Sequence, residues 1–360
     1  RRPLRAGLSV VGIAFGGAIL IGGTFSIDAM VVMMDREFNL TQRQDATVTF
    51  VEPASPSALD AVRRLPGVIH AEPFRSVPVK IRNGHRSRTT AITGRVPGAD
   101  LVRVVNASGR HVGLPPDGLV RSSKLAELLR ADVGDVLTVE VREGRRPTLH
   151  LPVNRVVEEL LGTSAYIALP ALHRRLHEGD VLSGAHLLVD GTDAQRLYRR
   201  LKELPVVAGV SITHAAQRSF DETLMENFGI ARTVSIVFAS IIAAGVVYNT
   251  ARISLAERAR ELATLRVIGL TRGEISFILL GELAILTLLA VPLGLLLGRA
   301  MASAMVQAYD TELFRLPLVI APATYARSAV TVLLAAAASG LIVRRRLDRL
   351  DLVAVLKTRE

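Results

Sequence analysis

Four long apolar segments limit what this chain can fold into. In chain order they are residues 8–27, 233–251, 275–298 and 323–343. The first runs for 20 residues without a charged side chain, and the second runs for 19. A helix of about 20 apolar residues is long enough to cross the roughly 30 Å hydrocarbon core of a bilayer. We therefore expect four transmembrane helices.

Two charged residues fall within the later segments. Glu282 is the single acid in the third segment, about two turns inside it, and Arg327 lies near the outer end of the fourth. An arginine near a helix end can extend its charged group to the membrane interface, so Arg327 is compatible with a fourth span. An unpaired acid near the bilayer centre costs a few kcal/mol, and less at this depth. We interpret Glu282 as an interhelical hydrogen-bonding group.

The basic residues indicate how the spans are oriented. The chain has a net charge of +11. Residues 1–5, 251–274 and 344–360 together hold 14 Lys/Arg against 6 Asp/Glu, whereas residues 35–229 hold 26 against 23. Short loops rich in Lys and Arg stay on the cytosolic side. The sequence therefore predicts cytosolic termini and places residues 35–229 outside the cell membrane, and nucleic-acid binding is not needed to explain the charge.

The first segment has a second interpretation, as a cleaved signal peptide. Twenty uncharged residues are long for a signal core, however, and no convincing small-x-small cleavage site precedes Asp28. The chain begins with Arg1 rather than Met, so we expect the native start to lie upstream. The chain contains no cysteine, which excludes disulfides and thiol-ligated metal sites.

The region from Asp35 to Gly229 is predicted to be a mixed α/β domain. Alternating apolar and polar residues predict strands at 46–51, 77–82 and 135–142. Amphipathic patterns predict helices at 57–65, 122–130 and 193–204, with Gly- and Pro-containing turns between the elements. The predicted fold class is an α+β membrane protein with four transmembrane helices. The extracytoplasmic domain is inserted between the first and second of them.

Catalytic and metal-binding patterns are not evident in the sequence. His173 and His177 are spaced i, i+4 on a predicted helix, but the glutamate of an HExxH motif is absent and no third ligand is evident. Ser122 is interpreted as a helix N-cap rather than a nucleophile, and no G-x-S-x-G occurs. We therefore predict no catalytic residues and no metal site.

Between the second and third spans lies a short cytosolic segment with helix-forming composition. Ser254 to Gly269 is rich in Ala, Leu, Glu and Arg, which favour helix, and an apolar stripe recurs at helical spacing. Gly269 is a suitable C-terminal stop. Thr271 and Glu274 then form a capping box directly before an apolar run. The sequence predicts a short helix joined tightly to the third span, or alternatively an amphipathic helix lying in the lipid interface.

The stretch ERARELATLRVIG, Glu257 to Gly269, resembles the signature of FtsX-like ABC permeases, which include MacB-type exporters and lipoprotein-extraction permeases. Three further stretches resemble parts of that family. The entry into its first span is resembled by RRPLRAGLSVVGIAFG, and its cytosolic tail by RRRLDRLDLVAVLKTRE. Its third span, including an acid at the position of Glu282, is resembled by ISFILLGELAILTLLAVPLGLLLG. LDAVRRLPGVIHAEP and GLVRSSKLAELLRADVGDVLTVEV resemble its periplasmic core domain. The coupling stretch is the more specific part, and it looks closest to the second half of duplicated long members.

The resemblance implies a transport permease whose segment near 254–269 is the coupling helix that docks on an ABC ATPase. No G-x-x-x-x-G-K-[ST] motif occurs, so the chain is expected to bind no cofactor directly, and ATP and Mg²⁺ would be held by the partner ATPase. The expected coupling residues are Glu257, Arg258, Glu261, Leu262, Leu265, Arg266 and Gly269. Under this interpretation Glu282 could also serve the transport cycle.

Four glycines are candidates for close helix packing. Gly12 and Gly16 in the first span, and Gly294 and Gly298 in the third, each form a G-x-x-x-G pair. They are expected to pack helices within one permease half, or alternatively to line the contact with a second half.

The expected organisation has three parts: residues 1–34 with the first span, the extracytoplasmic domain 35–229, and an FtsX-like permease domain 230–360 with tail 344–360. The chain would reside in the bacterial inner membrane. Its expected partners are an ABC ATPase, a second permease half, membrane lipid and an optional periplasmic adaptor. Expected cargoes are lipids, lipoproteins, peptides or amphiphilic drugs. The alternatives are a transmitter that regulates an external enzyme or sensor without moving cargo, and a membrane receptor with no motor.

Overall fold

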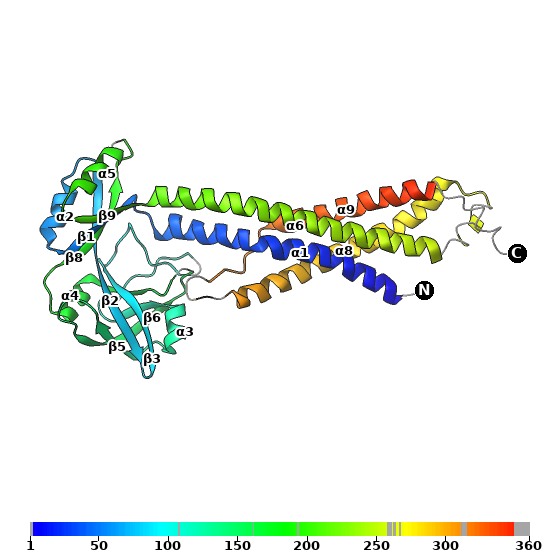
Figure 1. Cartoon of the computed structure of the whole chain (residues 1–360). Coiled ribbons are helices and arrows are strands. Elements are labelled where there is room, and N and C mark those ends of the chain that lie inside the picture. The colour runs from blue at the N-terminus through cyan, green and yellow to red at the C-terminus, as the bar shows by residue number, and fades with distance from the viewer. Residues whose placement is uncertain are drawn as a thin grey trace. The chain divides into compact units, whose positions relative to one another are not determined.

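The computed structural model describes residues 3–348, except 107–108, 161, 193, 258–260, 262–263, 266–267, 310 and 312–314 (Figure 1). The chain divides into two compact units. The helical unit comprises residues 1–30, 224–309 and 318–360, and the β-rich unit comprises residues 31–223 and 310–317. Each unit is described separately below.

Four long helices carry the apolar segments. They are α1 (Pro3–Asp35), α6 (Thr213–Glu257), α8 (Arg272–Ala308) and α9 (Pro322–Asp348). Among the described residues, each contains a stretch long and apolar enough to cross a membrane, as the sequence predicts. The helices are longer than the apolar runs. Helix α6 begins at Thr213, 20 residues before the apolar run that starts at Thr233. The residues before Thr233 include many polar side chains, but they favour helix and so extend it beyond the apolar run.

The four helices of the helical unit pack around small apolar side chains. One buried cluster takes Ala14 from α1, Val247 from α6, Ala290 from α8 and Val332 from α9. A second joins Ala251, Leu279, Leu283 and Val343 from α6, α8 and α9. All four helices therefore belong to one core.

The β-rich unit contains a nine-stranded sheet and four short α-helices in its described residues. Its elements are, in order, the π-helix η1 (Arg36–Thr41), β1 (Ala46–Ala54), α2 (Pro56–Arg63), β2 (Val68–Asn83), β3 (Arg86–Arg95), β4 (Leu119–Ser122), α3 (Ser123–Leu129), β5 (Val136–Val141), β6 (Thr148–Val157), β7 (Ala165–Ala168), α4 (Leu169–Leu176), β8 (Leu182–Val189), α5 (Ala194–Glu203) and β9 (Val207–Ile212). The mixed α/β fold class is thus confirmed.

One half of the β-rich unit is a four-stranded antiparallel sheet in the order β2-β8-β1-β9. The chain runs β1-α2-β2 and then β8-α5-β9, which is the split βαβ topology of ferredoxin-like folds. Leu59 and Val62 of α2, and Leu197 and Leu201 of α5, are buried in the core of this half. This half therefore begins and ends the unit, and the remaining strands are inserted between β2 and β8.

The inserted half is a small closed barrel. The pairings β2–β3, β3–β7, β7–β4, β4–β6, β6–β5 and β5–β2 form a complete ring of strands. Closure leaves no free strand edge within the ring. Strand β2 is long enough to serve both halves, because residues 68–74 pair with β8 while residues 74–83 pair with β3 (Figure 1). Helices α3 and α4 cover the barrel with Leu125, Leu129 and Leu172.

The chain enters and leaves the ferredoxin-like half at neighbouring strands. Ala46 at the start of β1 pairs with Ile212 at the end of β9, and the Thr213 amide donates to the Asp45 carbonyl oxygen at 2.9 Å. Helices α1 and α6 therefore join this unit at one hydrogen-bonded strand pair.

The connection between α8 and α9 belongs to the β-rich unit by its contacts. Leu316 is buried, the Arg315 amide donates to the Leu160 carbonyl oxygen, and the Arg315 guanidinium bonds Glu127 of α3 at 2.7 Å. Sequence patterns did not predict this attachment, because the segment has no periodic signal of its own.

Several local predictions can be compared with the structure. The strands predicted at 46–51, 77–82 and 135–142 and the three predicted helices are confirmed, and Ser122 caps α3 by accepting from the Leu125 amide. The predicted His173–His177 helix is wrong at its end. His177 is the left-handed C-cap residue of α4, and His173 is buried with its Nε2 2.9 Å from the Val181 carbonyl oxygen.

Candidate functional site

The predicted coupling segment follows the end of α6. Glu257 is the last residue of α6 and is exposed, and Glu261 is also exposed. Arg258, Leu262 and Arg266 lie outside the described residues. The structure therefore places only part of the predicted set.

The segment ends at Gly269, where the backbone turns. Gly269 has a φ of 113°, a conformation that residues with a Cβ adopt only with strain, and the Leu270 amide donates to the Leu265 carbonyl oxygen. The Thr271 hydroxyl then accepts from the Glu274 amide, and the Glu274 carboxylate accepts from the Thr271 amide at 2.7 Å. The predicted capping box is confirmed. It starts α8 two residues after the turn.

Apolar contacts fasten this turn to the helices. Ile275 of α8 is fully buried, and Leu255 of α6 packs against it together with Leu265 and Leu270. Leu255 lies in the last turn of α6 and Ile275 in the first turn of α8, so these contacts join the end of one helix to the start of the other.

The four glycines lie at close helix contacts within the chain. Gly12 faces Val246 and Gly16 faces the Ala239 carbonyl oxygen, both on α6. A Cβ at Gly294 would lie 2.8 Å from the Ala14 carbonyl oxygen, and one at Gly298 would lie 2.7 Å from Ile21 Cβ. The glycines of α8 therefore allow it to approach α1 closely. Glu282 lies on α8 and is half-buried.

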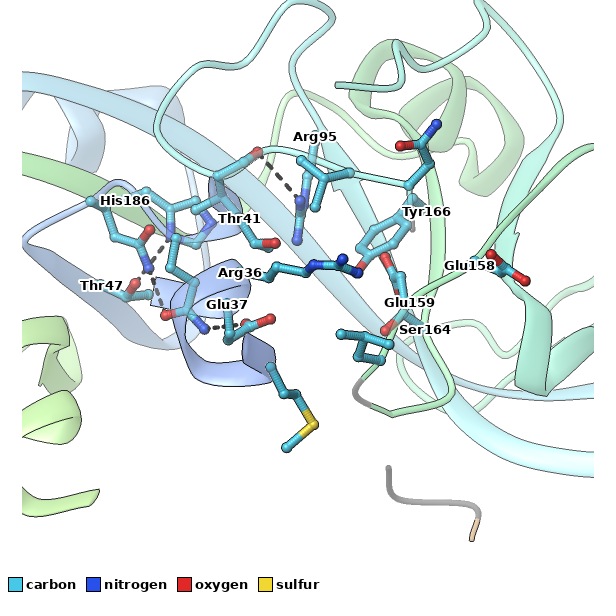
Figure 2. Close-up of a pocket in the computed structure, with 17 residues that line it drawn as sticks. Arg36, Glu37, Thr41, Thr47, Arg95, Glu158, Glu159, Ser164, Tyr166 and His186 are labelled. Atoms are coloured by element: carbon cyan, nitrogen blue, oxygen red, sulfur yellow. Dashed lines mark hydrogen bonds between the residues drawn. The ribbon is translucent and has the colours of Figure 1, made fainter. Parts of the chain in front are cut away.

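The β-rich unit contains a polar pocket of about 290 Å³ (Figure 2). Its wall combines the π-helix η1, strands β1, β3, β7 and β8, and the loops after β3 and β6. The charged or aromatic lining residues are Arg36, Glu37, Arg95, Glu158, Glu159, Tyr166 and His186. A π-helix is rare and recurs at functional sites, and here it directly continues α1.

Burial shifts the pKa of two groups that line this pocket, Glu159 and Tyr166. Burial raises the pKa of Glu159, while the hydroxyls of Tyr166 and Ser164 and the charge of Arg95 oppose that rise. Burial also raises the pKa of Tyr166, and its phenol stays protonated. The Arg95 guanidinium lies over the Tyr166 ring, 4.4 Å from its centroid, and donates to the Val102 carbonyl oxygen at 3.3 Å.

His186 is the neutral base of the pocket. Burial and the nearby Arg95 charge lower its pKa to about 3. Its Nδ1 lies 3.0 Å from the Thr47 hydroxyl, and its ring stacks on Phe74 with centroids 4.6 Å apart. At neutral pH the imidazole is uncharged.

Three buried polar atoms in the pocket have no hydrogen-bond partner among the described residues. They are Gln44 Oε1, Arg95 Nε and Glu159 Oε2. An orphaned buried polar atom costs about 1–3 kcal/mol, so their gathering at one cavity points to a group that completes them. Sequence analysis missed this site. Two sequence features could have indicated it: the charged residues directly after the first apolar run, and the Glu158–Glu159 pair directly after β6. Many solvent-exposed surfaces share both features.

Comparison with known proteins supports the family assignment. Residues 233–352 match the family model described as FtsX-like permease C-terminal. A curated relative, an uncharacterized ABC transporter permease protein of Mycobacterium tuberculosis, is 26% identical over 190 residues, which are 51% of this chain and 22% of that protein. The match thus covers about a fifth of the relative's length.

Two solved structures resemble the β-rich part of the chain. The extracellular domain of the noncanonic ABC-type transporter YknZ from Gram-positive bacteria is 13% identical, with a TM-score of 0.31 over 47% of this chain and 99% of that one. The periplasmic region of MacB from Actinobacillus actinomycetemcomitans is 13% identical, with a TM-score of 0.34 over 51% and 95%. The family model thus assigns an FtsX-like permease C-terminal domain to residues 233–352, which are one third of this chain.

Proposed function

We propose that this chain is one permease half that converts ATP hydrolysis by a partner ATPase into movement of its β-rich unit outside a bacterial cell membrane. The work would export or extract lipids, lipoproteins, peptides or amphiphilic compounds. The observation that carries the proposal is the joint at Ile275, where Leu255, Leu265 and Leu270 lock the turn between α6 and α8. Through these contacts, a force applied near Leu265 would reach the last turn of α6 and the first turn of α8.

The input side of the proposed mechanism is polar. Glu257 and Glu261 are exposed and so are available to a cytosolic partner. Leu265 contacts Ile275, which gives it a fastening role in the proposal. The apolar contact with the ATPase is then assigned to Leu262, and Arg258 and Arg266 add charge.

The output side uses the two attachments of the β-rich unit. Helices α1 and α6 join the ferredoxin-like half at β1 and β9, whereas the α8–α9 connection is bonded to the barrel side through Arg315. If the pair α1 and α6 moved relative to the pair α8 and α9, the two movements would therefore act on different halves of the β-rich unit. In this proposal such a displacement closes or opens the unit on cargo.

A charge-reversal experiment tests the input. The complex with the ABC ATPase encoded beside this chain's gene is reconstituted in lipid vesicles, and ATP hydrolysis is measured with and without the permease. We expect the double variant Glu257→Arg, Glu261→Arg to lose most of the permease-dependent change in ATPase rate. Glu203→Arg, an exposed charge of α5 in the β-rich unit, is the matched control. Unchanged coupling in the double variant would contradict the proposal.

A second candidate function is transmission of a signal without transport. It is favoured by the pocket of about 290 Å³, which is too small for a lipid or a lipoprotein and adjoins the end of α1. The same vesicles separate the two functions. Release of labelled lipid or lipoprotein that requires ATP supports transport, whereas altered activity of an external partner without release supports signalling.

A further inference from the structure

The pocket beside η1 has the features of a ligand site that neither the family nor the proposed transport function explains. Side chains from η1, β3, β7 and the loop after β6 converge on it (Figure 2). Arg36 extends across the cavity toward Tyr166 and Glu159, and Arg95 lies beside the Tyr166 ring. The volume of about 290 Å³ corresponds to roughly ten water molecules at about 30 Å³ each, which suits a ligand of amino-acid size.

The unpartnered atoms define what such a ligand must offer. Arg95 Nε is a donor without an acceptor, and it belongs to a cation. Gln44 Oε1 and Glu159 Oε2 are acceptors without donors, and one of them belongs to a carboxyl group. The complementary molecule therefore carries both a negative acceptor and N–H donors.

The remaining lining groups are already engaged or directed elsewhere. Glu37 Oε1 accepts from Gln42 Nε2 at 2.6 Å, and Gln44 Nε2 donates to Gln42 Oε1 at 3.3 Å. Glu158 is exposed and points away from the other labelled side chains. The Tyr166 ring carries Arg95 on its face, so that face is not open for stacking a sugar or a base.

We propose that this pocket binds a small zwitterion whose oxyanion bonds Arg95 and whose ammonium group bonds Glu159. Free α-amino acids have this chemistry, and so does the phosphoethanolamine headgroup of a lipid. A guanidinium binds an oxyanion through charge-assisted hydrogen bonds, and a carboxylate does the same for an ammonium group. The zwitterion adds no net charge to the cavity, and its ammonium group would favour the ionised form of Glu159.

The test compares matched probes on the full chain in nanodiscs made only of phosphatidylglycerol. Glycine and phosphoethanolamine carry both charges, acetate and glycerol 3-phosphate lack the ammonium group, and ethanolamine lacks the oxyanion. Isothermal titration calorimetry is expected to show each zwitterion binding at least about tenfold more tightly than its single-charge counterparts. Equal affinities within each matched set, or no binding of either zwitterion, would overturn the proposal without any variant.

Variants then assign the two ends. Glu159→Gln is expected to remove the advantage of phosphoethanolamine over glycerol 3-phosphate, and Arg95→Gln to weaken both probes about tenfold. Arg82→Gln, which removes an exposed pair with Glu140 on the barrel, is the matched control and should change nothing. Retention of the zwitterion preference in Glu159→Gln would refute the assignment.

Nanodiscs that contain phosphatidylethanolamine identify the source of the ligand. A bound lipid headgroup would suppress the binding of soluble phosphoethanolamine, whereas unchanged binding would indicate that the ligand is a free solute.

Discussion

Arg75 is the residue at which the two halves of the β-rich unit meet. It follows Phe74, the residue of β2 that pairs with both β3 and β8. Its buried guanidinium bonds Glu143 after β5, Glu178 after α4 and the Ser183 hydroxyl of β8. Burial lowers the pKa of Arg75, but the hydrogen bonds and charges of Glu178 and Glu143 outweigh burial, and the net pKa is raised. The fully bonded cation joins barrel and sheet.

A second buried arginine provides a contrast. Arg121 of β4 is fully buried and donates to the Ala131 carbonyl oxygen, but its Nε and Nη1 have no hydrogen-bond partner among the described residues. We expect Arg75→Met to lower the free energy of unfolding by about 2–3 kcal/mol, because two partly buried acids lose their cation. Arg121→Met is expected to raise it by about 1 kcal/mol, since a poorly paired buried charge is replaced by an apolar side chain. Urea titration of the detergent-purified chain, followed by the β-sheet circular dichroism signal, measures both, and equal effects would contradict this account.

His186 predicts an acid-sensitive β-rich unit. Its pKa of about 3 in the fold lies below the usual value of 6.5, so the unfolded chain binds more protons between these values. Stability is therefore expected to fall as pH drops from about 6.5 toward 3. Glu159 has the opposite effect on stability, because its pKa is raised in the fold. Its contribution to the free energy of unfolding is present at low pH and is lost as the pH rises above the usual carboxyl range. Melting temperatures from pH 7 to pH 4 should decline less steeply in His186→Gln than in the wild type. An identical decline would show that His186 carries no such linkage.

At the scale of single elements, the start of α8 depends on its capping box. Removing a Thr N-cap costs about 1 kcal/mol because an amide at the helix start loses its acceptor. We expect Thr271→Ala to increase amide hydrogen exchange over residues 273–276 and to weaken permease-dependent ATPase coupling. Thr271→Ser keeps the hydroxyl and serves as the control. Faster exchange with normal coupling would show that the joint near Ile275 does not need a rigid helix start.

Helix α8 also offers a matched pair of glycines. A Cβ at Gly294 meets the Ala14 backbone at 2.8 Å, whereas one at Gly281 on the same helix meets nothing within 4 Å. Gly294→Val is expected to separate α8 from α1 and to cost about 1–3 kcal/mol through overpacking. Gly281→Val should have little effect. Melting temperatures in detergent compare the two variants, and equal values would mean that α1 and α8 do not pack through Gly294.

Local patterns predicted the elements whose physics is local. The alternation in DVLTVEVR gave β5, the amphipathic pattern of 193–204 gave α5, and the Thr271 cap gave the start of α8. Hydropathy did not predict where α6 begins and ends, because residues on both sides of its apolar run also favour helix. The barrel and the pocket depend on pairings between distant residues. Arg95 and Tyr166 lie on strands that pair in parallel across about 70 positions, and no spacing in the sequence reports such a contact.

At the scale of the whole molecule, segments of the helical unit and of the β-rich unit alternate along the chain. The β-rich unit interrupts the helical unit twice, once between α1 and α6 and once between α8 and α9. Each interruption follows a candidate span, so a topology in which all four helices cross the membrane would put both insertions on the same side. The turn between α6 and α8 then belongs to the opposite side. The transport proposal and the signalling alternative both require this separation.

Cysteine labelling tests the separation directly, because the chain has no native cysteine. Glu261→Cys reports the turn and is exposed, and Glu203→Cys reports an exposed position on α5 of the β-rich unit. In intact cells a membrane-impermeant maleimide should label Glu203→Cys and spare Glu261→Cys, whereas both should react after the membrane is permeabilised. Lys and Arg in the short loops predict this outcome, since they resist transfer across the membrane. Labelling of both positions in intact cells would place the turn outside, where no ATPase could reach it. The β-rich unit would then have no source of ATP-driven movement.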